Sequence, residues 1–189
     1  IWIALYYLPI GGAIFRLALP LPLVLLHLRR GLKKGIEGLF LSILLLIALM
    51  GPVRGPLILF PYGFLSLWLG WSWSRKFNWW ISWSVGTLIG TTGFLVRVLA
   101  LSLLVGENLW VVITRAGAGL IEKVVNIFHL SITPDMLQVQ LVAISLVVFQ
   151  EFIYVLCLHA LSFWIFSRLK APIPDPPHLL NGLVVLDPL

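Results

Sequence analysis

Long apolar stretches, separated by short basic or Pro- and Gly-containing turns, make up most of the chain. One long stretch, 79–105, carries a single charged residue, Arg97. It exceeds the roughly 20 residues that a helix needs to cross a bilayer. Ser82, Gly86 and Gly90 recur every four positions, so these small residues share one helix face and allow a second helix to approach closely. We expect this stretch to be the central membrane-spanning helix, with the small-residue face as a helix-packing or partner interface.

Five other apolar stretches predict further membrane-spanning helices. They cover residues 1–8, 13–28, 36–50, 57–73 and 136–166. The first has the pattern of the end of a helix whose beginning is absent, so we expect the natural N-terminus, with any targeting segment, to lie upstream. Pro20 and Pro22 lack backbone N–H donors and predict a kink in the second stretch.

By apolar length, the chain contains about six spans. The predicted fold class is therefore all-α: a polytopic membrane helix bundle, with its first span truncated, in which residues 1–170 form a single transmembrane domain. Residues 171–189 are rich in proline, which cannot donate the N–H bond that a helix requires. We expect this segment to be an extended C-terminal tail.

Residues 109–130 have a different pattern. Arg115, Glu122, Asn126 and His129 recur at helical spacing, opposite an apolar face. This spacing predicts an amphipathic helix, which the topology puts on the outer side of the membrane. The helix either lies on the membrane surface or inserts with its polar residues against protein, and the sequence is compatible with both arrangements.

Basic residues lie beside the apolar stretches in three clusters, which together hold eight of the 13 Lys and Arg residues. The clusters are Arg29–Lys34, Arg75–Lys76 and Arg168–Lys170, and they predict the cytoplasmic or stromal ends of the helices. Only 11% of the residues are charged and 60% are hydrophobic, whereas a soluble domain has about 25% charged residues. The composition indicates a multi-pass integral membrane protein. The positions of the charges explain the net charge of +6 without a nucleic-acid partner.

Motifs of the common catalytic sites are absent from the sequence. It contains no G-x-x-x-x-G-K phosphate loop, no H-E-x-x-H zinc motif and no serine nucleophile motif, so we expect neither an enzyme nor a bound cofactor. A metal site would need the scattered residues His27, His129 and His159. The topology puts His27 near the inner face and His129 on the outer side, so we expect no metal site.

Charged residues inside the apolar stretches have the most potential for chemistry. Arg97 lies in the outer half of its span, and Glu151 lies near the middle of the last span. Charges at that depth are costly unless they are paired or face a polar cavity. One interpretation is a structural ion pair between Arg97 and Glu151. The other is a polar cavity for a small ligand, with the outer loop as a lid. The candidate ligand-binding residues are then Arg97, Glu107, Asn108, Trp110, Arg115, Glu122, Asn126, Glu151 and Tyr154.

Several segments resemble a known family of membrane proteins. They are Leu19–Gly31, Met50–Arg54, Phe60–Gly63 with Gly70, Gly86–Phe94 with Arg97, Leu103–Trp110 and Pro172–Pro177. Together they make the chain similar to the YybS-like family of uncharacterised bacterial membrane proteins, and most of all to its cyanobacterial branch. The resemblance covers nearly the whole chain and implies a cyanobacterial or chloroplast membrane.

That family resembles in fold the S components of energy-coupling factor (ECF) transporters. The resemblance implies a substrate-binding membrane subunit of an ABC-type importer for a small molecule such as a vitamin or a metal. Such subunits dock on a membrane T component with two ABC ATPases, through an Ala-x-x-x-Ala-like face on a first helix that is largely missing here. The alternative is a structural or assembly subunit of a larger membrane complex, such as a photosynthetic one. The small-residue face and the amphipathic helix would then be protein contacts.

Overall fold

The computed structural model describes residues 19–127, 135–171 and 173–177. Within these ranges all regular secondary structure is helical, which confirms the all-α prediction for the described part of the chain. The helices are α3 (Leu21–Arg30), α4 (Leu32–Met50), α5 (Arg54–Leu59), α6 (Tyr62–Ser74), α7 (Trp79–Val105), α8 (Leu109–Ile127) and α9 (Met136–Arg168).

Two of these helices, α7 and α9, are long and apolar enough to cross a membrane on their own. Both begin where the sequence predicts. Asn78 caps α7 by accepting a hydrogen bond from Trp80 N, and Asp135 caps α9 in a capping box with Gln138, which satisfies N–H groups that lack helical partners. The count of about six spans stays a prediction, because residues 1–18 lie outside the described residues.

Pro20 and Pro22 lie at the start of α3. The kink predicted within the stretch 13–28 stays a prediction, because residues 13–18 lie outside the described residues. Pro20 precedes the first helical residue, Leu21, and Pro22 belongs to the first turn. N–H groups in the first turn have no partner within a helix, so proline fits there without distortion. Gly31, with φ of 83°, separates α3 from α4, and the two helices pack against each other.

The apolar stretch 57–73 is likewise divided, into α5 and α6. Helix α5 ends at Leu59 and α6 begins at Tyr62, because Pro61 cannot donate the N–H bond that would continue α5. Helix α6 then packs between α3 and α7. Its buried residues Leu65, Leu69 and Trp73 form a core with α3, α7 and α9.

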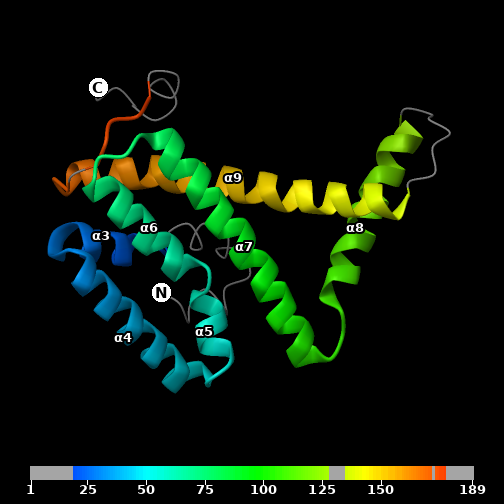
Figure 1. Ribbon diagram of the computed structural model, residues 1–189, viewed down its shortest axis with the longest axis horizontal. Helices are drawn as coiled ribbons and strands as arrows, with labels where there is room; N and C mark the ends of the chain where they lie inside the picture. The colour runs from blue at the N-terminus through cyan, green and yellow to red at the C-terminus, as the bar shows by residue number, and fades with distance from the viewer. Residues whose placement is uncertain (1–18, 128–134, 172, 178–189) are drawn as a thin grey trace.

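The basic ends of the helices gather at one end of the molecule, as the charge pattern predicts. Figure 1 shows the α3–α4 junction, the α6–α7 turn and the end of α9 on the same side. Two long-range hydrogen bonds join these segments. Arg29 Nη2 donates to Leu169 O (3.5 Å), and Trp79 Nε1 donates to Pro174 O (2.9 Å). Residues 173–177 are not helical, and this part of the Pro-rich tail thus packs back onto the bundle.

Close contacts of α7 with its neighbours depend on residues without bulky side chains. Gly86 faces Val155 of α9, Gly90 faces Glu151, and Gly93 lies against Pro61. Helices α7 and α9 therefore run antiparallel and in contact over their inner halves. The outer half of α9 diverges from α7 and packs against α8 instead, so that the three helices outline a triangle in Figure 1.

Large apolar side chains are exposed along α4 and along the outer halves of α7 and α9. Phe40, Leu44, Leu99, Leu103 and Phe149 each keep at least 60% of their surface exposed. Apolar patches of this extent are unfavourable in water, whereas lipid chains solvate them. The exposed faces therefore fit a chain surrounded by a bilayer.

Replacing Gly93 by alanine is expected to destabilise the bundle. A Cβ atom at this position overlaps with the Pro61 ring, and relief of the clash requires a backbone shift of α6 or α7. Overpacking of this kind costs about 1–3 kcal/mol, so the melting temperature of the purified protein in detergent should fall.

The matched control for this substitution is Gly119→Ala on α8, where a Cβ has no neighbour within 4 Å. Alanine is the better helix former by up to about 1 kcal/mol, so the control should melt at the same temperature or slightly higher. Equal melting of the two variants would contradict the packing described for Gly93.

Candidate functional site

The most buried acidic side chain of the described residues is Glu151, near the middle of α9. It keeps 8% of its surface exposed. A Cβ atom built on Gly90 would lie only 2.5 Å from Glu151 Oε2, so the carboxyl group rests directly on the backbone of α7. One turn on, the Tyr154 ring lies 5.7 Å from the Tyr62 ring of α6. Three helices thus enclose a polar site within the apolar bundle.

Arg97 and Glu151 do not form the ion pair that the sequence suggests. The one salt bridge within the described ranges joins Lys34 and Glu37 (2.6 Å). The reason is geometric. Glu151 packs at the level of Gly90, and Arg97 follows seven residues later, about 10 Å further along the helix. At that level α9 has already diverged from α7 (Figure 1).

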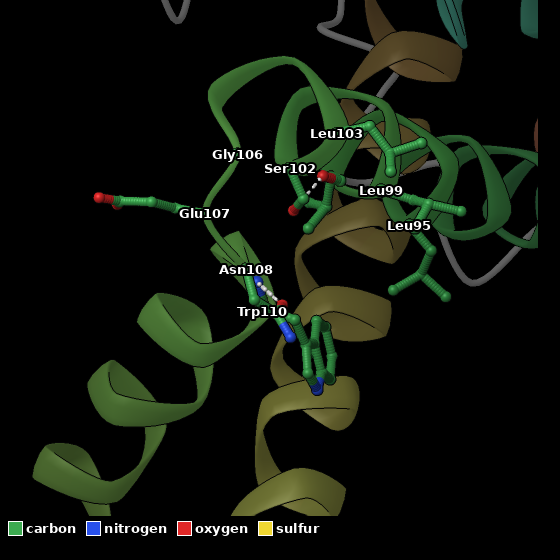
Figure 2. A pocket seen from close by; sticks show the side chains of 9 residues that line it. Leu95, Leu99, Ser102, Leu103, Gly106, Glu107, Asn108 and Trp110 are labelled. Carbon is green, nitrogen blue, oxygen red and sulfur yellow. Dashed lines mark hydrogen bonds between the residues drawn. The ribbon is translucent and has the colours of Figure 1, made fainter.

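The outer end of α7 borders a cavity of about 500 Å³. Its walls are mainly apolar, and its lining residues are Leu95, Val98, Leu99, Ser102, Leu103, Gly106, Glu107, Asn108 and Trp110. Figure 2 shows these side chains at the turn between α7 and α8. Three of the nine ligand-binding candidates therefore come together here: Glu107, Asn108 and Trp110.

Two polar side chains of this cavity already make hydrogen bonds within the protein. Ser102 Oγ donates to Val98 O (2.8 Å) and accepts from Leu109 N (3.0 Å), and Asn108 Oδ1 accepts from Trp110 N (3.1 Å). These bonds shape the turn. The Glu107 side chain is exposed and points away from the leucines in Figure 2. The wall that faces the cavity is thus formed by leucines and Trp110.

The other candidates do not line this cavity. Arg115 and Glu122 are exposed on α8, which packs against α9 where Gly117 contacts Ala143. The side chain of Asn126 lies outside the described residues. The structure therefore separates the candidates into an outer group on the α7–α8 turn, a group within the membrane around Glu151 and Tyr154, and exposed charges on α8.

Sequence reasoning did not identify a second buried polar group, near the inner end. His159 Nε2 lies 3.1 Å from Ser82 Oγ, which lies 2.9 Å from Ser72 Oγ, and His159 Nδ1 lies 2.8 Å from Val155 O. A carbonyl oxygen only accepts, so Nδ1 carries the proton. In the neutral ring Nε2 then accepts from the Ser82 hydroxyl. All three polar side chains are buried.

This group joins three helices, since Ser72 belongs to α6, Ser82 to α7 and His159 to α9. The rings of Trp73 and Trp79 flank the imidazole, with centroids 5.2 and 5.3 Å away. The sequence did contain a signal for this group. Two serines and a histidine lie within apolar stretches, which indicates that they have hydrogen-bond partners inside the bundle. Whether these three side chains meet depends on the angles at which their helices cross, which the sequence pattern does not give. Among the described residues, no group of three His, Cys, Asp or Glu residues is placed to hold a metal ion.

A family model described as "Predicted membrane protein (DUF2232)" matches residues 1–181. No curated protein and no solved structure matches the chain.

Replacing Ser82 by alanine is expected to destabilise the fold. It leaves His159 Nε2 without its donor, whereas Ser72 keeps its hydrogen bond to Leu69 O (3.1 Å). An unsatisfied buried polar group costs about 1–3 kcal/mol. The melting temperature in detergent should fall, whereas Ser84→Ala, at an exposed position of the same helix, should have almost no effect. If both variants melted like the wild type, the hydrogen bonds of this group would make no net contribution to stability.

Proposed function

The chain belongs to the DUF2232 family of predicted membrane proteins, and from this premise we propose that it is a substrate-binding membrane subunit of an energy-coupling factor (ECF) ABC-type importer. In this role it resembles an S component, and it captures a small molecule such as a vitamin or a metal on the outer side. The proposed partners are a membrane T component and two ABC ATPases. The proposed location is a cyanobacterial or chloroplast membrane, to which the resemblance of the YybS-like segments points.

The observation that carries this proposal is the position of Glu151. Its carboxyl group is buried between α7 and α9, and no salt bridge joins it to another described residue. An ionisable group within a membrane helix is costly, and it is characteristic of substrate and ion pathways. Gly90 has no side chain and therefore leaves room for this carboxyl group, whereas a larger residue at position 90 would collide with it.

The cavity at the α7–α8 turn supports the proposal from the outer side. A volume of about 500 Å³ is within the usual range for small-molecule sites, which combine apolar walls with a few polar groups. Leu95, in its wall, lies five residues beyond Gly90, about 7.5 Å along the helix. We propose that a ligand enters through this cavity and that Glu151 interacts with its polar or cationic part. The absence of a phosphate-loop motif fits a subunit that depends on separate ATPases.

The alternative function is a structural or assembly subunit of a larger membrane complex. It depends on the small-residue face of α7 and on the amphipathic helix as contacts for other proteins. Ser82, Gly86 and Gly90 are buried within the chain itself, against α6 and α9. That face is therefore occupied within the chain, and the exposed side of α8 is the contact that remains for this alternative.

Purification from the native membrane in a gentle detergent tests the proposal directly. Mass spectrometry should find a T-type membrane protein and two ABC ATPases with the tagged chain, together with a small molecule that leaves on denaturation. Recovery of photosynthetic subunits or assembly factors, with no ATPase, would contradict the importer and favour the alternative.

Glu151→Gln is expected to reduce the recovered small molecule at least tenfold, because truncating one side of a buried charged contact costs about 2–5 kcal/mol. Glutamine has nearly the same shape, so the melting temperature should change little. The matched control is Gln150→Ala, at the adjacent exposed position of α9, which should retain the ligand. Equal recovery from all three proteins would exclude Glu151 from the binding site.

A further inference from the structure

The net charge of the described residues is concentrated at one end of the molecule. Eight cations and two carboxylates, Glu37 and Asp175, lie in the basic clusters and residues 173–177, whereas the other four described cations are matched by four described carboxylates. All eight cations are exposed. Within the described residues Lys34 is the one cation neutralised by a salt bridge, with Glu37. This end therefore has a net charge of +6, and the other described residues together have none.

The fold brings these cations together from segments that are far apart in sequence. Arg29 Nη2 donates to Leu169 O (3.5 Å), which joins the α3–α4 cluster to the end of α9. Trp79 Nε1 donates to Pro174 O (2.9 Å), which joins the α6–α7 turn to the segment after α9. Figure 1 shows the three basic segments side by side at one end of the bundle. The three basic clusters thus lie on neighbouring segments at this end.

Two tryptophans fix the level of this surface relative to the bilayer. The Arg75 guanidinium lies 5.8 Å from the ring centroid of Trp71, and the Arg168 guanidinium lies 5.0 Å from that of Trp164. Trp164 is 45% exposed at the inner end of α9. Exposed tryptophans of membrane helices lie at the level of the lipid headgroups, and the cation–π contacts hold both guanidinium groups beside these rings. Arg75 and Arg168 are therefore placed at the depth of the lipid phosphates.

From this geometry we propose that the basic end is a binding surface for anionic phospholipids, which recognises the phosphodiester headgroup through Arg75, Arg168 and the neighbouring cations. A guanidinium group binds phosphate through two parallel hydrogen bonds, and basic residues at the membrane surface attract anionic lipid. An acidic protein would also be attracted by the charge. The tryptophan rings favour lipid, because they place the cations within the headgroup layer and not beyond it.

The test measures lipid binding to the purified full-length chain in detergent by native mass spectrometry. The probes are dioleoylphosphatidylglycerol, which is anionic, and dioleoylphosphatidylcholine, which has the same chains and no net charge. The wild type should prefer the anionic lipid, and added salt should weaken that preference. Arg75→Gln with Arg168→Gln should weaken binding of the anionic lipid by about fivefold for each cation removed.

The matched control removes the same charge elsewhere. Arg115 and Lys123 are exposed on α8, away from the basic end, so Arg115→Gln with Lys123→Gln should leave lipid binding within about twofold of the wild type. Comparable melting temperatures show that both double variants are folded. If one variant fails to fold, the lipid preference of the wild type and its salt dependence decide the question.

Three results would overturn the proposal. Equal binding of the two lipids by the wild type would show that the surface does not select anionic headgroups, and an acidic protein partner would then explain the charge better. Equal loss of anionic-lipid binding in both double variants would show that the net charge of the protein, and not the position of the cations, determines the binding. Competition by millimolar inorganic phosphate as effective as that by the anionic lipid would identify a site for free phosphate.

Discussion

Close helix packing at the inner half of α7 is the constraint on which the other features depend. Within a bilayer, helices gain little from the hydrophobic effect, so their association depends on close contact and on hydrogen bonds between them. Gly86, Gly90 and Gly93 provide the contacts with α9 and α6, and Ser82 provides the hydrogen bonds to Ser72 and His159. The same contacts place the Glu151 carboxyl group against the backbone of α7, where a larger residue at position 90 would displace it.

The outer half of the bundle has no equivalent row of contacts. Beyond Gly90, α7 and α9 diverge, and α8 packs against α9 instead (Figure 1). The divergence explains three observations together. Arg97 has no acidic partner within the described residues, large apolar side chains are exposed to the surroundings, and a cavity opens at the α7–α8 turn. A tightly packed inner half and an open outer half suit a subunit that captures its ligand from outside.

Charge follows the same division of the molecule. Among the described residues, the cations and carboxylates outside the basic end balance one another, whereas the packed inner end carries the net charge. Basic residues favour the cytoplasmic side, and contacts such as Arg29 with Leu169 bring three separate clusters onto one surface. Orientation and lipid contact therefore depend on the same residues, and the proposed substrate site lies apart from them.

Local patterns in the sequence were enough to predict the helical class, the bounds of α7, the start of α9 and the common side of the basic clusters. Each depends on local signals: apolar length, capping residues and charge beside a span. The sequence also pointed to Glu151 and to the residues of the α7–α8 turn. That Arg97 does not reach Glu151 and that His159 bonds to Ser82 became visible only in the folded chain. These outcomes depend on the angles at which helices cross and on where the helices diverge. Side-chain packing between segments far apart in the sequence sets both, and no local pattern encodes them.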